Sequence, residues 1–278
     1  MKYSIITINR NNAAGLGQTI SSVLAQSCTD YEYIIVDGAS TDTSVDVIVE
    51  LCSGRTNVRW ISEPDSGIYN AMNKGVAMAC GEYVLFLNSG DTFAGNEVMS
   101  AMDSETGVEE IVIGRVNVVK EGKIVSTSPV LSNDDLTLYN IYLRGIPHQA
   151  AFIKRDLLVR CPYDESLKIN SDWKFFVQEI VLDGVSVKTV PVIIADYDGE
   201  GISSTNMDML LAEREKVFRE IVPARIAADY LAVAPHYYEV VRVKWLLAHP
   251  LFYKVYRMWS SLGLKLSKQT DERTDQVS

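Results

Sequence analysis

The chain has 278 residues, of which 47% are hydrophobic and 22% charged, a size that fits one large α/β domain with an extension or two small domains. The net charge of -10 argues against general nucleic-acid binding. Four cysteines without paired spacing indicate neither a disulfide framework nor a zinc site and fit a reducing compartment. We expect no cleavable signal and no transmembrane helix, because Met1 leads directly into an apolar strand and no run of about 18 apolar residues follows.

The N-terminal third of the chain alternates between short apolar runs and helical patterns. Strands are predicted at residues 3–8, 33–36, 58–61 and 82–87, which are too short for helices. Helices are predicted at residues 17–26 and 43–51 and from residue 68 to the stop at Cys80-Gly81, with Asp65 or Ser66 as the cap of the last helix. This alternation indicates a parallel sheet with right-handed crossovers.

Each predicted strand ends in a polar loop. The residues at or just after these ends are Thr7, Asn9, Asp37, Asp65 and Asp91. Because open α/β sheets bind ligands at the carboxyl ends of their strands, a ligand site is predicted there. A single aspartate of this kind can instead cap a turn or helix, which is the better interpretation of Asp42. No Gly-x-Gly-x-x-Gly follows the first strand, which argues against a Rossmann dinucleotide site. No P-loop pattern occurs either, which argues against a P-loop phosphate site.

Five stretches of the sequence, taken in order, are typical of one enzyme family. They are SIITINRNN, QTISSVLAQSCTDYEYIIVDGASTD, EPDSGIYNAMNKGVAMACGEYVLFLNSGD, IPHQAAF and NSDWKFF. Over residues 2–204 the chain resembles the family-2 inverting glycosyltransferases of the GT-A fold, in particular bacterial enzymes that build surface polysaccharides. The resemblance implies an α/β catalytic domain at residues 1–204, with a mostly parallel central sheet flanked by helices. It also implies sugar transfer from a nucleotide donor, usually a UDP-sugar, to an acceptor hydroxyl with inversion.

The resemblance assigns several residues to the donor. Thr7 and Asn9 match the loop that contacts the nucleoside, and Asp37 matches the loop beside uracil or ribose. Asp65 matches the Asp-Ser-Gly turn near the uridine and the sugar, and Ser89 lies in the predicted donor loop. Lys74 matches a cation found near the phosphates, with a solvated surface lysine as the alternative.

A divalent cation can neutralise the charge of a leaving diphosphate, and carboxylate oxygens suit Mn2+ or Mg2+. Asp91 is the candidate metal ligand. Asn88 and Gly90 stand where the carboxylates of the family's Asp-x-Asp pattern are commonest, so the pyrophosphate oxygens would have to supply other ligands. The alternative is that Asp91 caps a helix beginning near Ala94.

An inverting transfer needs a base for the acceptor hydroxyl. Asp172 matches the family's base and is predicted at the start of a helix, whose dipole favours the carboxylate; the alternative is a helix cap. His148 matches the family's His-Gln segment and is expected to contact the donor phosphates or the acceptor. Residues 196–203 resemble a loop that closes over the donor.

The segment after the catalytic domain is predicted to form a helical extension at residues 205–268 and a disordered tail at residues 269–278. Between residues 236 and 268 there are six Lys or Arg and one acid, interleaved with aromatic residues. Basic amphipathic helices of this kind bind anionic membrane surfaces, which would place the protein in the cytoplasm, at the inner face of the cell membrane. A helical lid or a dimer contact is the alternative, and the oligomeric state is left open.

The leading prediction is therefore a metal-dependent inverting glycosyltransferase with a lipid-linked glycan as acceptor. A sugar-phosphate nucleotidyltransferase would need a Gly-rich, basic first loop, which residues 9–12 do not provide. A degenerate domain that binds nucleotide or serves as a scaffold is supported only by the missing Asp-x-Asp acids.

Overall fold

A computed structural model describes residues 1–199 and 206–233, with positions 236, 239, 242, 245, 249, 252–255, 257 and 258 of the remainder. The chain divides into two compact units, Met1–Ile221 and Val222–Ser278. The part of the predicted helical extension after residue 233 lies mostly outside the described residues, as do residues 200–203 of the predicted closing loop and the predicted tail at residues 269–278. The domain bounds at residues 204 and 268 stay predictions.

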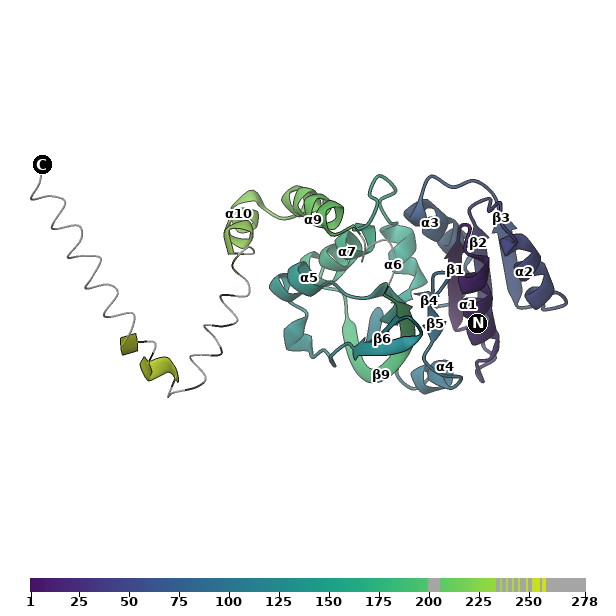
Figure 1. The fold of residues 1–278 in the computed structure, drawn as a ribbon, viewed down its shortest axis with the longest axis horizontal. Coiled ribbons are helices and arrows are strands. Elements are labelled where there is room, and N and C mark those ends of the chain that lie inside the picture. Colours follow the sequence, from purple (N-terminus) through teal and green to yellow (C-terminus); the bar gives the residue numbers. More distant parts are fainter. Residues whose placement is uncertain are drawn as a thin grey trace, which may run out of the picture. The chain divides into compact units, whose positions relative to one another are not determined.

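The first unit is built on a nine-stranded sheet flanked by helices (Figure 1). The strand order is β3-β2-β1-β4-β8-β6-β9-β5, with β7 paired to β6. The strands are β1 (Tyr3–Asn9), β2 (Tyr31–Asp37), β3 (Val58–Ser62), β4 (Tyr83–Phe86), β5 (Thr92–Phe93), β6 (Ile111–Lys120), β7 (Lys123–Thr127), β8 (Ala151–Lys154) and β9 (Val187–Asp198).

The helices of the first unit are α1 (Ala13–Leu24), α2 (Ser44–Cys52), α3 (Ile68–Met78), α4 (Val98–Met102), α5 (Leu138–Arg144), α6 (Arg155–Arg160), α7 (Ser171–Phe176) and α9 (Met207–Ile221). Short 3-10 turns occur at η1 (Asn133–Asp135) and η2 (His148–Ala150), and α7 continues into a π-helical segment, η3 (Val177–Leu182). The second unit contains α10 (Ala224–Val233).

The predicted alternation of four strands and three helices is confirmed, with small differences at the ends. Helix α1 begins at Ala13, earlier than predicted, because the Asn12 side chain accepts a hydrogen bond from the Gly15 N–H and caps the helix. Helix α3 has Gly67 as its N-cap without a side-chain cap. Asp65 instead accepts from the N–H of Gly67 itself, so the predicted capping of α3 by Asp65 or Ser66 is wrong.

The predicted architecture of a central sheet flanked by helices is confirmed, and its strands form both parallel and antiparallel pairs, with β6 and β9 also parallel. β3, β2, β1 and β4 are parallel, whereas β8 is antiparallel to both β4 and β6. β6 and β7 form a hairpin, in which Glu121 (φ 50°) and Gly122 (φ 71°) adopt the left-handed conformations of a tight turn. Parallel neighbours need a long crossover connection, which the helices between β1 and β4 provide. The two-residue turn between β6 and β7 is too short for a crossover and therefore joins antiparallel strands.

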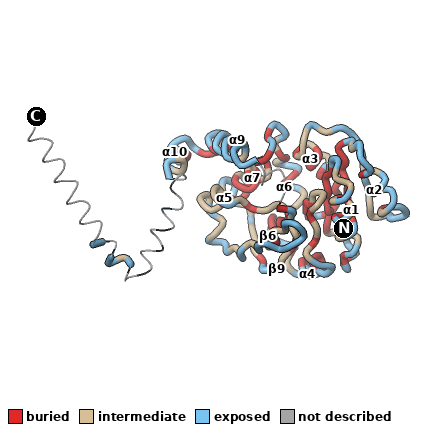
Figure 2. The backbone as a smooth tube through the Cα atoms, in the orientation of Figure 1, coloured by how far each residue is buried: buried red, intermediate tan, exposed pale blue. Residues whose placement is uncertain are grey.

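Helices cover both faces of the parallel part, where the buried residues concentrate (Figure 2). Ile5 belongs to the apolar cluster that includes Leu16 and Ile20 of α1. Ile6 points to the other face, where a Cβ on Gly75 of α3 would lie 2.5 Å from its Cγ2. This close approach brings α3 onto the strands, so that its N-terminus borders the carboxyl ends of β1 and β4.

Candidate active site

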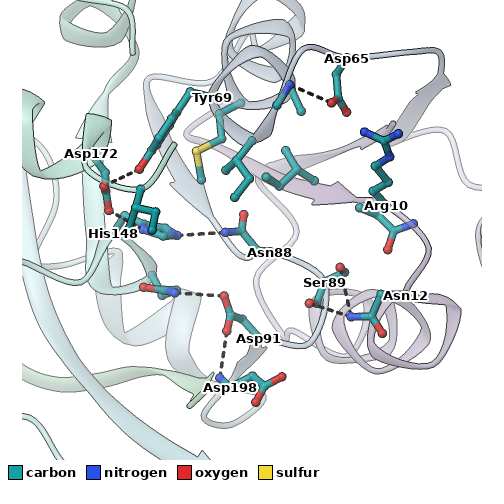
Figure 3. Close-up of a pocket in the computed structure, with 18 of the residues that line it drawn as sticks. Arg10, Asn12, Asp65, Tyr69, Asn88, Ser89, Asp91, His148, Asp172 and Asp198 are labelled. Atoms are coloured by element: carbon teal, nitrogen blue, oxygen red, sulfur yellow. Dashed lines mark hydrogen bonds and ion pairs between the residues drawn. The ribbon is translucent and has the colours of Figure 1, made fainter. Parts of the chain in front are cut away.

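A cavity of about 740 Å3 opens at the carboxyl ends of β1 and β4, a size that suits a small-molecule site. Its walls come from six segments of the first unit. The lining residues are Ile8 to Asn12, Asp65, Gly67 to Tyr69, Ala71, Met72, Asn88, Ser89, Asp91, His148, Gln149, Lys168, Ile169, Asp172, Tyr197 and Asp198. Figure 3 shows how their polar side chains converge.

The structure brings most of the predicted site residues to this cavity. Those that line it are Asn9, Asp65, Ser89, Asp91, His148 and Asp172. Asn12, which was not predicted, holds the loop after β4 by donating from Nδ2 to the Ser89 carbonyl oxygen at 3.1 Å. Asp65 stands at the α3 end of the cavity, beside the side chain of Arg10 (Figure 3).

Thr7, Asp37 and Lys74 are not brought to the cavity. The Thr7 hydroxyl donates to the Leu87 carbonyl oxygen at 2.7 Å inside the sheet, since alternate residues of a strand face opposite sides. Lys74 Nζ lies 2.7 Å from the Glu63 carboxylate and 2.8 Å from the Pro64 carbonyl oxygen, so it fastens the turn that contains Asp65.

Asp37 is fully buried and organises the loop after β2. Burial raises the pKa of this carboxyl, but hydrogen bonds from Ser40, Ser62 and Asn9 outweigh burial and hold the pKa below its ordinary value. The Asn9 Nδ2 to Asp37 Oδ1 distance is 2.8 Å, so Asp37 acts on the cavity by orienting Asn9.

Asp91 lies at the floor of the cavity and is only 4% exposed. Its Oδ1 accepts from the Asp198 N–H at 3.0 Å and its Oδ2 from Gln149 Nε2 at 3.2 Å. Burial raises the pKa of Asp91 to about 6, because the hydrogen bonds and nearby His148 do not offset the loss of water. The alternative that Asp91 caps a helix near Ala94 is wrong, since residues 92–93 form β5 and α4 begins at Val98.

The residues around Asp91 fit a divalent cation only if a bound molecule or water supplies part of the coordination shell. In the described part of the chain no three His, Cys, Asp or Glu side chains are grouped as a complete metal site. The buried Asp91 carboxylate nevertheless needs a positive charge to stabilise its ionised form. Asp198, a residue of the predicted closing loop that was not singled out as a ligand, brings a second carboxylate to this region: a Cβ on Gly90 would lie 3.3 Å from its Oδ2.

Asp172 stands at the other side of the cavity, in the first turn of α7. Its Oδ1 accepts from the Tyr69 hydroxyl at 2.9 Å and its Oδ2 lies 3.0 Å from His148 Nδ1. Burial raises the pKa of Asp172, but these hydrogen bonds and the positive charge that His148 can take up outweigh burial and lower the pKa. The N-cap of α7 is Asn170, so the alternative that Asp172 caps the helix is wrong.

Helix α9 fixes the segment that leads into α7. The Glu213 carboxylate accepts from the backbone N–H groups of residues 168, 169 and 170 at 2.7, 2.9 and 2.9 Å. Arg214 donates to the Tyr142 carbonyl oxygen and lies over the Trp173 ring, 5.1 Å from its centroid. The position of Asp172 thus depends on a helix that sequence reasoning had placed outside the catalytic domain.

Sequence reasoning missed most of the cavity's supporting residues. Gln149 follows His148, and Tyr69 lies in the first turn of the helix predicted from residue 68, but no local pattern shows that their side chains reach Asp91 and Asp172. Asn12 carried a usable signal, because an asparagine between a strand and a helical pattern is a favoured N-cap. Asp198 was visible only as one acid of a loop resemblance.

Comparisons with known proteins agree on one family. The family model described as glycosyl transferase family 2 matches residues 4–123. An uncharacterised glycosyltransferase of Mycobacterium tuberculosis is 31% identical over 210 residues, covering 72% of this chain and 76% of the relative. The PGL/p-HBAD biosynthesis glycosyltransferase of Mycobacterium bovis is 29% identical over 219 residues, covering 76% and 83%.

Two solved structures share the fold at low sequence identity. Residues 1–349 of S. aureus TarS, in complex with UDP-GlcNAc, give a TM-score of 0.60 at 18% identity, covering 84% of this chain and 71% of that one. The present chain covers 42% of the length of a longer TarS chain. The mannosyltransferase PcManGT of Pyrobaculum calidifontis, in complex with GDP-Man and Mn2+, gives 0.58 at 16% identity, covering 94% and 83%. These likenesses confirm the GT-A fold.

Proposed function

Since the chain belongs to glycosyl transferase family 2, we propose that it transfers a sugar from a nucleotide donor, a UDP-sugar, to an acceptor hydroxyl with inversion at the anomeric carbon. The observation that supports this most is the arrangement of the cavity. A buried carboxylate, Asp91, lies on the strand-end loop, and a second carboxylate, Asp172, lies on α7 across the same space. One can serve the leaving diphosphate and the other the acceptor.

The donor is proposed to lie along the strand ends, with its nucleoside toward Asn9 and Asp65 and its diphosphate toward Ser89 and Asp91. TarS has been solved with UDP-GlcNAc and PcManGT with GDP-Man, which supports a nucleotide sugar as the donor class. The cavity-lining cations Arg10 and Lys168 add positive charge for an anionic ligand. Thr7, Asp37 and Lys74 would act indirectly, by shaping the loops.

A Mn2+ or Mg2+ ion is proposed at Asp91, with Asp198 as a further oxygen ligand and the donor's phosphates completing the shell. When bound, the ion supplies positive charge to the departing diphosphate. The Mn2+ in the PcManGT complex supports this choice of cofactor. The residues of the chain itself bind and orient: Gln149 and the Asp198 N–H hold the carboxylate of Asp91 in place.

On the acceptor side, Asp172 is proposed as the base required for transfer, taking up the hydroxyl proton directly or through His148, to which it is hydrogen-bonded. The side chain of Asp172 is 18% exposed, so an acceptor can approach it from the cavity. The attacking oxygen bonds to the anomeric carbon on the face opposite the diphosphate, which produces inversion.

The acceptor is proposed to be a lipid-linked glycan used for a bacterial surface polysaccharide, met at the inner face of the cell membrane. No helix among the described residues is both long and apolar enough to cross a bilayer. The basic, aromatic composition of residues 236–268 motivates peripheral binding to an anionic membrane. Flotation with anionic liposomes tests this: equal flotation after deletion of residues 235–278 would contradict it.

The function is tested by incubating the protein with a panel of UDP-sugars and GDP-mannose, with Mn2+ or with EDTA, and measuring release of nucleoside diphosphate. We expect release from at least one UDP-sugar that EDTA abolishes and that Asp91→Ala loses. No release from any donor by a protein that still binds UDP would favour the degenerate nucleotide-binding domain instead. Release of pyrophosphate from UTP and a sugar phosphate would indicate a nucleotidyltransferase.

A further inference from the structure

Helix α9 lies beside α5 and α7 in the first unit (Figure 1). Two neighbouring residues of α9, Glu213 and Arg214, form hydrogen bonds to the segments around both helices. Neither of them is among the residues that line the cavity. The segments that they hold lead directly to Asp172 and His148, the polar pair on the acceptor side.

Glu213 holds the backbone immediately before α7. Its Oε1 accepts from the Lys168 N–H at 2.7 Å, and its Oε2 accepts from the N–H groups of Ile169 and Asn170 at 2.9 Å each. The N–H groups at and before the N-cap of a helix have no partner within the helix. A carboxylate that accepts from three of them in a row therefore fixes where α7 begins, two residues before Asp172.

The side chain of Asn170 is held by the same helix. Its Nδ2 donates to the Leu210 carbonyl oxygen at 2.9 Å, and its Oδ1 accepts from Arg214 Nε at 3.3 Å. The two partners require this orientation of the amide, because a carbonyl oxygen can only accept and a guanidinium can only donate. Asn170, the N-cap residue of α7, thus uses its side chain to contact α9 instead of capping α7.

Arg214 also joins α7 to the end of α5. Its Nη1 donates to the Tyr142 carbonyl oxygen at 2.9 Å, in the last turn of α5, where carbonyl groups lack partners within the helix. The guanidinium lies over the ring of Trp173, whose Nε1 donates to the Ile141 carbonyl oxygen at 2.8 Å. Because α5 ends four residues before His148, Arg214 connects the segment that leads to His148 with the segment that carries Asp172.

The charge of Arg214 acts on Asp172 as well. Burial lowers the pKa of the Arg214 guanidinium, and the negative charge of Asp172 opposes this lowering, so the two groups interact electrostatically. A nearby cation in turn favours the ionised form of a carboxyl group. Asp172 must be ionised to take up a proton, so the position of Arg214 supports the role proposed for this carboxylate.

We propose that Glu213 and Arg214 are positioning residues for the transfer step, which together fix the Asp172 carboxylate relative to His148 and to the acceptor. This inference rests on the proposed transferase function, in which Asp172 is the base. It gives α9 a role in the rate of transfer and none in donor binding. A misplacement of about 1 Å at a reacting group can lower a rate by about a hundredfold, so a loosened start of α7 is enough to slow the reaction.

The competing explanation is that the two residues only stabilise the packing of α9. Loss of stability would reduce the amount of folded protein, and with it the number of UDP-binding sites and the total activity in equal proportion. Loss of positioning would instead lower the activity of each remaining site. The quantity that separates the two explanations is therefore kcat divided by the number of UDP sites measured on the same sample.

The test uses two substitutions on α9, each with a matched control on the same helix. Glu213→Gln replaces one accepting oxygen by an NH2 group, which cannot accept from a backbone N–H. Glu215→Gln is its control, because Glu215 is paired only with the exposed Arg219 among the described hydrogen bonds and ion pairs. Arg214→Met removes the guanidinium at the same length, and Arg219→Met is the control for that change.

The reaction followed is release of UDP from UDP-N-acetylglucosamine, or from the fastest donor of the panel, with saturating Mn2+ and water as the acceptor. We expect kcat per UDP site to fall by about ten- to a hundredfold in Glu213→Gln and in Arg214→Met, with the Kd for UDP unchanged. The two controls should stay within about twofold of the unchanged protein. A fall of less than about threefold, or a fall explained by fewer UDP sites, would overturn the proposal. Absence of turnover in the unchanged protein would refute the proposed function instead.

Hydrogen exchange tests the contact of Glu213 without turnover. In the unchanged protein, the N–H groups of residues 169 and 170 should exchange at least about tenfold more slowly than in an unfolded chain. This protection should be lost in Glu213→Gln and kept in Glu215→Gln. Rapid exchange of these N–H groups in the unchanged protein, or full protection in Glu213→Gln, would contradict the proposal whatever the activity.

Discussion

Replacement of Asp91 by asparagine is expected to stabilise the metal-free protein at neutral pH. Burial raises the pKa of Asp91 from 3.8 to about 6, and each pKa unit corresponds to about 1.4 kcal/mol. The ionised carboxylate therefore lowers the free energy of unfolding by about 3 kcal/mol above pH 6. Well below pH 3.8 the carboxyl is protonated in the folded and the unfolded protein, so this penalty is absent there; it grows between pH 3.8 and about 6 and is complete above that.

The substitution also removes an accepting oxygen, because the amide keeps only one. Asp198 N–H and Gln149 Nε2 both donate to the carboxylate, and the loss of one such bond costs about 1 kcal/mol. The net gain is about 2 kcal/mol at pH 7.5, which corresponds to a rise in Tm of about 4–8 °C for a chain of this size. At pH 4.5 the penalty is only about 1 kcal/mol and the net gain is near zero.

The assay is thermal unfolding in EDTA at pH 4.5 and 7.5, followed by circular dichroism. Asp134→Asn is the control, because it makes the same change of charge at an exposed position of η1 and should leave Tm within about 1 °C. Mn2+ with UDP should raise the Tm of the unchanged protein but not of Asp91→Asn. A lower Tm of Asp91→Asn at pH 7.5, or an equal gain at both pH values, would refute the argument.

Two further predictions test the packing at the amino ends of β1 and β4 and the contacts that hold the turn containing Asp65. Gly81→Ala should lower the free energy of unfolding in urea by about 1–3 kcal/mol, because a Cβ there would lie 2.6 Å from the Ser4 nitrogen. Gly95→Ala, whose Cβ would have nothing within 4 Å, should be nearly neutral. Equal effects of the two substitutions would contradict this packing argument. Lys74→Met should change the Kd for UDP by less than about threefold, because its ammonium is bonded to Glu63 and Pro64 outside the cavity, and exposed pairs contribute about 1 kcal/mol or less. A tenfold loss for UDP but not for uridine would show that Lys74 contacts the phosphates.

The parallel half of the sheet and its ligand edge could be predicted because their signals are local. Apolar runs, helical spacing and the polar residues after each strand all lie within a few residues of one another. The register Asn9 to Asp37 then brings the strand ends together, as the alternation of strands and helices implied. The later antiparallel strands gave no such signal, because pairing across the sheet is decided by packing rather than by spacing.

The site itself could be predicted only as a set of separate residues. Tyr69 and Asp172 are 103 residues apart, and Asn88 and His148 are 60 apart, so no pattern in the sequence joins them. Thr7 was misjudged for another reason: a shift of one residue along a strand turns a side chain to the opposite face. Lys74 lies on α3, at the position of the family's cation. Its long side chain reaches Glu63 and the Pro64 carbonyl oxygen instead of the cavity.

The most direct test of the central claim is to measure UDP binding and sugar release side by side in the unchanged protein and in Asp172→Asn. Asp91 and Asp172 lie on different sides of the cavity (Figure 3), and the proposal assigns the first to the donor and the second to the acceptor. With Mn2+ present, we predict the same Kd for UDP in both proteins, within about threefold, and loss of at least about a hundredfold in sugar release for Asp172→Asn. No UDP binding by the unchanged protein, or a strong loss of UDP affinity in Asp172→Asn, would contradict the account.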